Sequence, residues 1–342
     1  MPINPDQKLN HKLFDKTIEQ VTMRQGFGDG LVLAGTADKN VVALCADLTE
    51  SVFMKAFKDK YDDRFIEVGV AEQNLVTVAS GMAAMGKIPF VGSYAVFNPG
   101  RNWEQIRTTI CINDVPVKVI GFHTGVSVGP DGASHQALED IALMRALPNM
   151  IVISPCDSFE AQKAVIAAAK NGKPTYIRLS RDKTPVITSE HTPFEIGKAA
   201  IIFKSEIVGK NSQLKNSKYD LGIIATGSLL YRALSVAKRL ENEGKSVMVM
   251  NLATIKPLDE HAVTRFAQET GAIVTVEEHQ IAGGMGSAIA ECLAKNHPVP
   301  IEFIGVKDQF GQTGTASELI EHYEMGESHI YAAAQRAMLR KK

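Results

Sequence analysis

The chain has 342 residues, of which 45% are hydrophobic and 22% charged, and its formal net charge at pH 7 is −1. These proportions are typical of an ordinary globular protein of about two domains. The charge balance and the lack of a long basic run favour neither nucleic acid nor an anionic membrane surface as a partner. The sequence shows no apolar run long enough to span a bilayer and no signal-peptide pattern at its start. We therefore expect a cytoplasmic protein with no nucleic acid and no membrane among its partners.

The cysteines do not form a metal or redox pattern. They are scattered along the chain and include no Cys-x-x-Cys pair: Cys45, Cys111, Cys156 and Cys292. Their surroundings are mostly apolar, which is typical of buried free thiols.

The first half of the chain alternates predicted strands and helices. A helix over residues 13–38 is followed by an apolar strand, 41–46, of the kind that is buried on both faces of a parallel sheet. After a helix that ends near residue 60, strands are expected over 64–68, 89–92, 117–122, 151–154 and 175–179, with helices over 75–85, 102–112, 139–147 and 158–169. This alternation predicts a mostly parallel sheet flanked by helices.

The composition becomes polar between residues 190 and 218, which predicts a linker or an exposed hairpin. A second alternation follows, with strands expected over 221–225, 247–252, 272–276 and 301–304, and helices over 228–243, 259–270 and 284–295. The fold class predicted is therefore α/β, with two doubly wound α/β domains, residues 1–189 and 219–342, joined by residues 190–218.

Polar and aromatic side chains collect where the strands of the first domain end. In chain order these are Asp47, Ser51, Glu72, Tyr94, Phe97, His123, Asp131, His135 and Arg181, and Arg24 lies in the first predicted helix. Each of them alone has a structural explanation, as a core aromatic, a loop histidine or a surface charge. In open α/β sheets, however, ligands bind outside the carboxyl ends of the strands. The joint placement predicts one ligand site.

Glu72 stands where a predicted strand gives way to a nearly all-apolar helix, so we expect it to be buried. An ionised carboxylate removed from water costs several kcal/mol unless it finds a partner or takes up a proton. Backbone N–H groups at the start of the helix are one possible partner. The other residues at the strand ends favour a functional acid instead.

A Gly-rich segment, residues 121–136, carries His123, Asp131 and His135. Its glycines allow positive φ angles and a close approach of the backbone to a ligand. Two histidines and an aspartate suit proton transfer to hydroxyl and carbonyl oxygens near neutral pH. A metal site made of the same three residues is a weaker alternative, because no further spaced ligand set accompanies them.

Three motifs resemble the transketolase family: Gly69-Val70-Ala71-Glu72-Gln73, Ala46-Asp47-Leu48-Thr49-Glu50-Ser51 and Gly129-Pro130-Asp131-Gly132-Ala133-Ser134-His135-Gln136. The resemblance continues in the second domain with Val276-Glu277-Glu278-His279 and Gly283-Gly284-Met285-Gly286. It covers essentially the whole chain. The matching part of the family is the C-terminal half of transketolase, which consists of the pyrimidine-binding domain and the small C-terminal domain.

The resemblance implies thiamine diphosphate as the cofactor. Glu72 matches the acid that hydrogen-bonds the pyrimidine ring nitrogen, which turns the exocyclic amino group into the base that deprotonates the thiazolium ring. Tyr94 and Phe97 match the aromatic positions that pack on the pyrimidine. Asp47 matches a family acid close to the cofactor.

The resemblance also implies sugar phosphates as substrates. The groups that hold the sugar-phosphate end are matched by Arg24, Ser51, His123 and Arg181, and the planar fork of arginine suits phosphate oxygens. Asp131 matches an acid that reads a substrate hydroxyl next to the reacting carbon, and His135 a histidine near the ketose C1 and C2 oxygens. Gly100 departs from relatives that have an aromatic residue there, which predicts a looser pyrimidine pocket.

The family holds the cofactor diphosphate and its Mg²⁺ through a Gly-Asp-Gly motif followed downstream by an Asn. Gly28-Asp29-Gly30 lies inside a predicted helix, and no Asn occurs between Asn40 and Asn74, so we interpret this tripeptide as unrelated to metal binding. The implied protein is the C-terminal subunit of a split transketolase. It would transfer a two-carbon ketol unit only together with a separate N-terminal subunit that carries the Mg²⁺ ligands. Two copies of each half are expected, so this chain would also contact itself.

Three alternatives remain. Deoxyxylulose-phosphate synthase shares Ala71-Glu72-Gln73 and Asp131-Gly132, but it lacks the motif at 47–51 and usually carries both halves in one chain. The β subunit of 2-oxo-acid dehydrogenases is a separate half that lacks the Asp-Gly-x-x-His pattern of 131–135. A regulatory nucleotide-binding module would use residues 283–287 before a helix, although close helix–sheet packing explains those glycines more simply.

Overall fold

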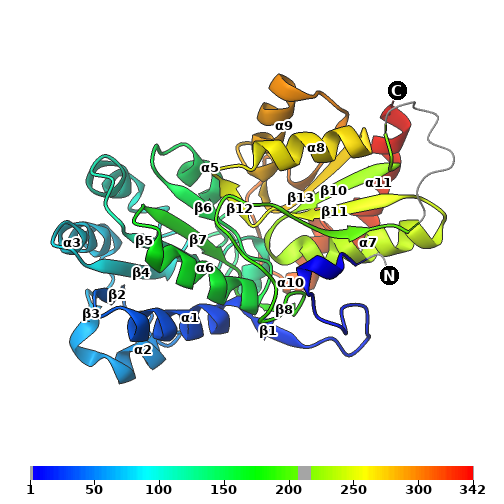
Figure 1. Cartoon of the computed structure of the whole chain (residues 1–342). Helices are drawn as coiled ribbons and strands as arrows, with labels where there is room; N and C mark the ends of the chain where they lie inside the picture. The colour runs from blue at the N-terminus through cyan, green and yellow to red at the C-terminus, as the bar shows by residue number, and fades with distance from the viewer. Residues whose placement is uncertain (1–2, 207–216, 342) are drawn as a thin grey trace.

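The computed structural model describes residues 3–206 and 217–341. It contains two α/β units side by side (Figure 1). The first unit is built on six parallel strands: β2 (Val41–Cys45), β3 (Phe65–Glu67), β4 (Ile88–Tyr94), β5 (Lys118–Phe122), β6 (Ile151–Ile153) and β7 (Thr175–Leu179). With the antiparallel edge strand β12 (Thr254–Lys256), the sheet order is β12-β6-β7-β5-β4-β2-β3. The predicted α/β class is confirmed.

The residues of β2 alternate between two helical layers. Val42 and Leu44 share a buried cluster with residues of α3 (Glu72–Ala84) and η3 (Ile106–Cys111). The other three residues of β2 share a second cluster with residues of α1 (Met23–Ala37) and α6 (Ser158–Lys170). All five residues are buried, because helices cover both faces of a parallel sheet. The remaining helices of this unit are α2 (Lys55–Lys60), η2 (Asp62–Arg64), α4 (Trp103–Gln105), η4 (Val126–Asp131) and α5 (Asp140–Arg145).

The second unit has four parallel strands, β10 (Leu221–Ala225), β11 (Val247–Asn251), β13 (Ile273–Gln280) and β14 (Ile301–Val306). The antiparallel strand β9 (Ala200–Lys204) forms one edge, in the order β14-β13-β10-β11-β9. Residues of α7 (Leu230–Asn242) and α11 (Glu327–Arg340) share one buried cluster with this sheet, and those of α8 (Glu260–Thr270) and α9 (Met285–Asn296) share another. Shorter helices are η5 (Gly227–Leu229), α10 (Ala316–His322) and, at the N-terminus, η1 (Pro5–Gln7).

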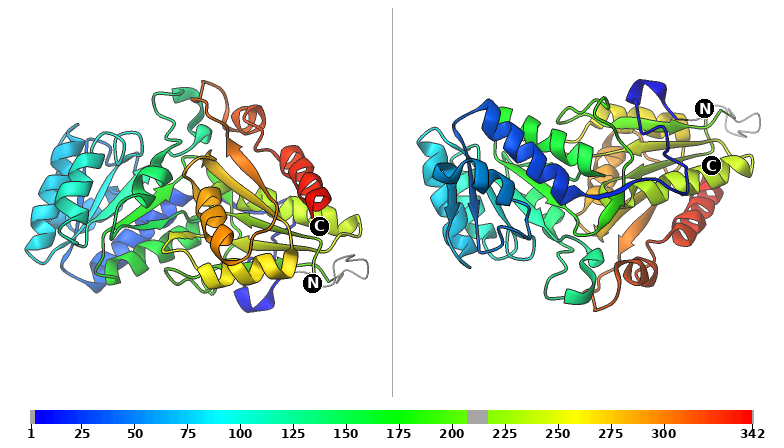
Figure 2. Two further views of the ribbon diagram at one scale, coloured as in Figure 1. Left: turned by 90° about the horizontal axis from the view of Figure 1, so that it is seen from above. Right: turned by 90° about the horizontal axis from the view of Figure 1, so that it is seen from below.

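Three segments differ from the sequence-based division. The segment 190–218 is more than a linker, because β9 supplies an edge strand to the second sheet; residues 207–216 lie outside the described residues. Strand β12 belongs to the second unit by sequence and pairs with β6 of the first. The N-terminal residues lie on the second sheet, where the N–H of Asn4 donates to the carbonyl of Ile202 at 3.0 Å. Both ends of the chain therefore lie at the second unit (Figure 2).

The helix predicted over residues 13–38 begins only at Met23. Residues Gln20–Thr22 form strand β1, which pairs with β8 (Lys183–Pro185). The Thr22 hydroxyl then accepts a hydrogen bond from the N–H of Gln25, which caps the helix. A pairing partner more than 150 residues away cannot be read from a local pattern.

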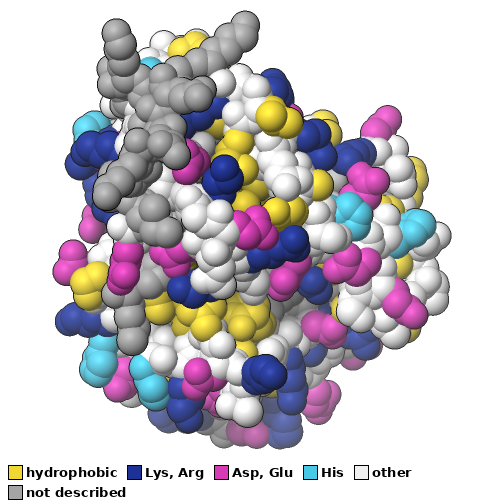
Figure 3. Space-filling model, turned by 90° about the vertical axis from the view of Figure 1, so that its right-hand side faces the viewer, with side chains coloured by type: hydrophobic (Ala, Val, Ile, Leu, Met, Phe, Trp, Pro, Cys, Tyr) yellow, Lys and Arg dark blue, Asp and Glu magenta, His cyan; other side chains and the backbone are white. Residues whose placement is uncertain are grey.

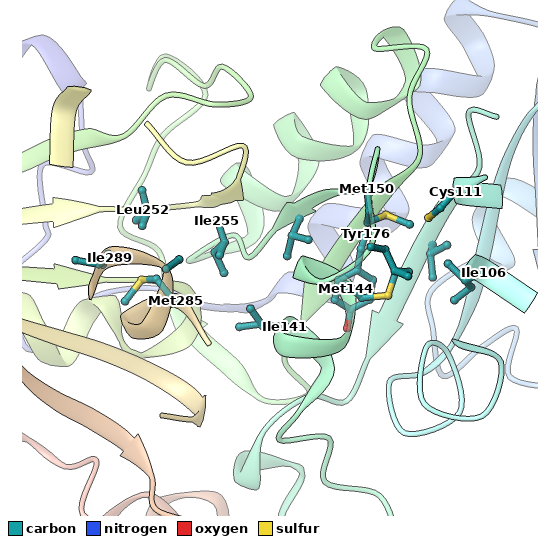
Figure 4. Close-up of a cluster of buried hydrophobic side chains, with 14 of the residues drawn as sticks. Ile106, Cys111, Ile141, Met144, Met150, Tyr176, Leu252, Ile255, Met285 and Ile289 are labelled. Carbon is teal, nitrogen blue, oxygen red and sulfur yellow. The ribbon is translucent and has the colours of Figure 1, made fainter. Parts of the chain in front are cut away.

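One apolar cluster continues from the first unit into the second (Figure 4). Its labelled members are Ile106, Cys111, Ile141, Met144, Met150 and Tyr176 from the first unit and Leu252, Ile255, Met285 and Ile289 from the second. Because the core crosses the boundary, the two units are fixed against each other. All four cysteines are free and buried, as predicted.

The surface carries charges of both signs. On the face shown in Figure 3, positive and negative side chains are interspersed, and hydrophobic side chains are exposed in small groups between them. Within the described ranges, 3–206 and 217–341, none of the helices has the length and apolar character needed to cross a membrane.

A buried polar cluster fastens α5 to β13. Nε of Arg178 pairs with Oδ2 of Asp140 at 2.8 Å. Nδ1 of His279 lies 2.7 Å from the carbonyl of Gln280, so it must carry the proton, and Nε2 accepts from the N–H of Ile141 at 3.2 Å. The ring is therefore neutral. Burial lowers the pKa of His279 from 6.5 to about 4.

We expect the stability contributed by neutral His279 to be complete above pH 6.5 and to be lost as pH falls toward about 4. In that window the unfolded chain binds a proton that the folded chain does not, which lowers the free energy of unfolding by about 3 kcal/mol. His279→Gln removes this titration. The stability advantage of the wild-type chain over the variant, measured by urea unfolding, should therefore shrink as pH falls. An advantage that is constant with pH would contradict the assignment.

Helices α1 and α6 cross in backbone contact at Gly26, where a Cβ would lie 1.8 Å from the carbonyl oxygen of Ser158. We expect Gly26→Ala to lower the free energy of unfolding by about 2–4 kcal/mol, because one helix must move. The matched control is Gly81→Ala in α3, where a Cβ meets nothing within 4 Å. It should stabilise the chain by about 0.5–1 kcal/mol. Equal changes in the free energy of urea unfolding for Gly26→Ala and Gly81→Ala would rule out the close contact of α1 with α6.

Candidate active site

The carboxyl ends of the parallel strands lie on one edge of the first sheet, and the predicted site residues gather there. Asp47 follows β2, Glu72 begins α3 after β3, Tyr94 ends β4, His123 follows β5 and Arg181 follows β7. Strands β3 and β4 flank β2 on opposite sides, so the connections diverge at this point. Such a switch point creates the crevice in which open α/β sheets bind ligands.

Glu72 is 2% exposed, as expected for the first residue of a buried helix. Its Oε2 pairs with Nη1 of Arg101 at 2.6 Å, and the hydroxyl of Ser93 donates to Oε1 at 3.4 Å. The side chain of Arg101 is 47% exposed, so the charge partner reaches the acid from the open side of the site. The carboxylate is held by side chains and not by N–H groups of its helix, which was the structural alternative.

Tyr94 and Phe97 form an aromatic wall at the end of β4. Their rings are stacked, with centroids 6.3 Å apart and planes at 27°. The Tyr94 ring lies 3.9 Å from the His123 ring, and the Phe97 ring lies 5.5 Å from the His135 ring. The guanidinium of Arg101 lies 4.5 Å from the centroid of Phe97. The aromatic wall therefore lies between Arg101, which pairs with Glu72, and the predicted site residues His123 and His135.

Arg24 is anchored at the other side of the wall. Its Nη1 donates to the carbonyl of Ser51 at 2.8 Å and its Nη2 to that of Arg181 at 2.9 Å, and its buried Nε has no hydrogen-bond partner within the described chain. Nη1 of Arg181 donates to the carbonyl of Val128 at 2.5 Å and lies 4.0 Å from Oδ1 of Asp131. The structure therefore brings together the residues predicted to hold an anionic substrate end. The Ser51 hydroxyl also lies 2.8 Å from the Tyr94 hydroxyl.

His123 is a buried neutral group. Burial lowers its pKa to about 3, and the charges of Arg24, Arg181 and His135 add to the effect. Its Nδ1 has no hydrogen-bond partner among the residues that the structure describes. Near pH 7 the ring can accept or donate a hydrogen bond to a ligand without adding a charge.

His135 and Asp131 are carried by the Gly-rich loop. The hydroxyl of Ser134 lies 2.9 Å from Nδ1 of His135, which restricts the orientation of the ring. Asp131 is exposed and faces Arg181. No group of three or more His, Cys, Asp and Glu side chains in residues 3–206 and 217–341 is arranged to hold a metal ion. The metal alternative for this loop gains no support from the geometry.

Asp47 is exposed and has a positive φ of 58°. Its N–H donates to Oε1 of Glu67 at 2.7 Å, and Oε1 also accepts from the N–H of Gly69 at 3.1 Å. Oε2 of Glu67 accepts from the hydroxyl of Thr49 at 3.1 Å. One carboxylate thus fixes the two loops that carry Asp47 and Glu72.

Sequence reasoning missed Glu67, Ser93, Arg101 and Asn102. The amide of Asn102 donates to the backbone carbonyl of Glu72 at 2.9 Å. For Ser93 and Arg101 the only signal in the sequence is that a buried carboxylate needs a partner. That signal does not identify which lysine or arginine of the chain will pair with Glu72.

Gly28-Asp29-Gly30 lies in α1, as predicted. A Cβ at Gly28 would lie 2.7 Å from the carbonyl oxygen of Phe53, and one at Gly30 would lie 2.9 Å from that of Gln162. These glycines therefore serve helix packing. At Gly100 a Cβ would lie 2.1 Å from the carbonyl oxygen of Val96, so this glycine marks a tight turn. The looser pyrimidine pocket stays a prediction.

We expect Arg101→Ala to leave Glu72 buried without its cation and to lower the free energy of unfolding of this chain by about 1–2 kcal/mol. The loss is smaller than for a fully buried pair, because Arg101 is half exposed. Adding Glu72→Gln should restore most of it, since a neutral amide needs no cation. Urea unfolding of both single variants and the double variant measures the coupling; purely additive effects would contradict the pair.

The sequence of this chain matches two known protein-family domains. Residues 19–186 match the family described as "Transketolase, pyrimidine binding domain", and residues 210–330 match "Transketolase, C-terminal domain". The 6-deoxy-6-sulfo-D-fructose transketolase subunit SqwH of Clostridium sp. is 37% identical over 328 residues, which cover 96% of this chain and 98% of that one. A subunit of the apulose-4-phosphate transketolase of Phocaeicola vulgatus is 34% identical over 314 residues, covering 92% and 96%.

A solved structure described as "Split gene transketolase, inactive beta4 tetramer" is 38% identical, with a TM-score of 0.84, and the match covers 94% of this chain and 100% of that one. Both matched regions occur in the order that the sequence predicts, and these relatives are matched almost end to end. The chain therefore belongs to the transketolase family, as the C-terminal subunit of a split transketolase-like enzyme.

Proposed function

We propose that this chain binds the aminopyrimidine part of thiamine diphosphate and, together with a separate N-terminal subunit, transfers a two-carbon ketol unit between sugar phosphates. The observation that carries the proposal is the buried Glu72 carboxylate beside the aromatic wall, with its charge partner Arg101 on the open side. The family's two domains imply dependence on thiamine diphosphate.

The residues present fit the aminopyrimidine. A flat heterocycle needs an aromatic or apolar surface to stack on and a carboxyl group beside a ring nitrogen. The wall of Tyr94 and Phe97 supplies the first and Glu72 the second. Oε1 of Glu72 makes only a long, 3.4 Å contact with Ser93, so it has capacity for a further hydrogen bond. When bound, the cofactor supplies the carbanion chemistry that protein side chains lack.

Glu72 would share a proton with the pyrimidine ring nitrogen. A shared proton would reduce the charge that this buried side chain carries. Such a carboxyl group no longer needs a cation beside it, and the half-exposed Arg101 can turn to solvent at little cost. Asp47 lies at the end of the neighbouring strand and would face the cofactor from there.

The second end of the site suits an anionic sugar. Arg24 and Arg181 provide positive charge, with Ser51 and neutral His123 beside them. Asp131 and His135 would bind the hydroxyl and carbonyl groups of the ketose. By their names, the two relatives act on a sulfo-sugar and a sugar phosphate, both of which carry an anionic group. We propose phosphorylated ketoses as donors and phosphorylated aldoses as acceptors.

The N-terminal subunit would bind the diphosphate and Mg²⁺, because the Gly-Asp-Gly tripeptide of this chain is used to pack α1. Two copies of each subunit would form the enzyme, and a cytoplasmic location is part of the proposal. The split-gene relative is described as inactive in its beta4 form. That description supports a chain that needs its other half.

The test is a two-chain reconstitution. This chain alone, with thiamine diphosphate and Mg²⁺, should show no ketol transfer from xylulose 5-phosphate to ribose 5-phosphate, and the N-terminal subunit should restore it. Glu72→Gln in the complex should lower kcat by about 10²-fold or more while the subunits still assemble. The control Glu104→Gln, at an exposed acid three residues after Arg101, should leave the rate unchanged.

Two outcomes would overturn the proposal. Substantial turnover by this chain alone would remove the need for a partner. Use of pyruvate in preference to a ketose phosphate would favour the alternatives related to deoxyxylulose-phosphate synthase and 2-oxo-acid dehydrogenase.

A further inference from the structure

We propose that Glu278, in the second unit, is a positioning residue for the loop that carries Asp131 and His135. The inference rests on the proposed function, which assigns these two side chains to the substrate. Through this role the second unit would contribute to the reaction, although every predicted site residue lies in the first unit.

The carboxylate of Glu278 bridges the two units. It is 2% exposed, near the end of β13. Its Oε1 accepts from the N–H of Ser127 in η4 at 2.7 Å, and its Oε2 accepts from the hydroxyl of Ser228 in the second unit at 2.7 Å. A charged acceptor makes a stronger bond to an N–H group than a neutral one does.

Among the described residues this carboxylate makes no direct ion pair, although its charge and that of Arg178 attract each other at longer range. The nearby Arg178 uses Nη2 to donate to the backbone carbonyl of Glu278 at 2.6 Å and uses Nε to pair with Asp140. Burying a carboxylate without an ion pair is costly. Joining two domains does not require it, because the apolar core already does so. The placement of the charge against the loop backbone therefore indicates a specific purpose there.

The loop is shaped to receive this carboxylate. Gly125 has a φ of 80°, and a Cβ there would lie 2.1 Å from Oε1 of Glu278. A Cβ at position 125 would displace either the Glu278 carboxylate or the loop. The close approach of the carboxylate therefore requires a glycine at this position.

Other contacts attach the loop to the second unit further along. Nε2 of Gln136 donates to the carbonyl of Gln312 at 3.0 Å, and the N–H of Gln280 donates to the carbonyl of Leu138 at 2.8 Å. Helix α10 and η4 lie side by side in both views of Figure 2. Asp131 and His135 lie between the attachment at Ser127 and the one at Gln136.

A cavity of about 390 Å³ lies beside the Glu278 attachment and is lined in part by Ser127, Ser228 and Glu278. The loop is therefore not held there by close packing on every side. Removing the carboxylate should free the loop to move without creating a sealed void in a core. A shift of about 1 Å at a reacting group can lower a rate by about 10²-fold.

The neighbouring Glu277 is a matched control. It is also buried, and its two oxygens accept from the N–H groups of Met285 at 2.6 Å and Gly286 at 2.8 Å. Because side chains alternate along a strand, Glu277 faces α9 and Glu278 faces the loop. If an alanine variant acted only by destabilising the second unit, Glu277→Ala and Glu278→Ala should have similar effects.

The kinetic test compares three variants in the reconstituted complex. We expect Glu278→Ala to lower kcat/KM for the ketose donor by about 10–100-fold, with thiamine diphosphate binding retained, because Glu72 and the aromatic wall lie outside the loop. Glu278→Gln should stay within about threefold of the wild type, since an amide can accept from Ser127 and donate to Ser228. Glu277→Ala should also stay within about threefold at a temperature where it is folded. Equal losses in the two alanine variants would overturn the inference.

A second readout separates this inference from the proposed function. Hydrogen exchange of the backbone amides of residues 124–135, measured on this chain alone, should be faster in Glu278→Ala than in the wild type and in Glu277→Ala. Unchanged exchange would overturn the positioning role even if the complex is active. Absence of ketol transfer in the wild-type complex would instead overturn the proposed function, while faster exchange would still support the attachment.

Discussion

The site depends on holding one carboxylate in place inside the protein. Glu72 can begin α3 inside the protein only because Arg101 and Ser93 reach it from the end of β4 and the segment that follows. That segment is itself held in place: the amide of Asn98 donates to the carbonyls of Val91 and Ile120 at 3.2 and 3.1 Å, and its Oδ1 accepts from the amide of Asn102 at 3.0 Å. The hydrogen bonds that serve the acid also set the position of the aromatic wall. Acid and wall are therefore one structural unit.

Local patterns predicted the parts of this arrangement that depend on local physics. The apolar run of β2 predicted a strand buried on both faces, and polar residues after successive strands predicted a shared edge. The pattern could not supply partners distant in sequence. Arg101 lies 29 residues after Glu72, and Glu67 reaches Asp47 across 20 residues. Apolar periodicity also does not say which sheet a short strand joins, which is why β9 and β12 were not placed, and α10 and α11 were not predicted at all.

The exposed apolar residues of the first unit bear on its need for a partner. Val70 and Met85, at the two ends of α3, are 70% and 84% exposed, and Ile112 is exposed just after η3. Obligate interfaces are large and more apolar than the rest of a protein surface. The acid end of α3 faces the site, so a subunit that covers this helix would also close over Glu72. Burial of these residues by a partner subunit is a prediction that goes with the proposed function.

The alternation of side chains along β13 links the two units of this subunit. Glu277 turns to one face and caps α9 through two backbone N–H groups, whereas Glu278 turns to the other and reaches the Gly-rich loop of the first unit. His279, one residue further on, accepts the first N–H groups of α5, the helix that follows the same loop. Three successive residues of β13 thus hold three different segments: Glu277 holds α9, Glu278 holds the start of the Gly-rich loop, and His279 holds the helix that follows this loop. Without the second unit the acid and the aromatic wall would remain, and the loop would keep only its first-unit contacts, such as that of Arg181 with the carbonyl of Val128. This gives a physical reason for the two domains to remain in one chain.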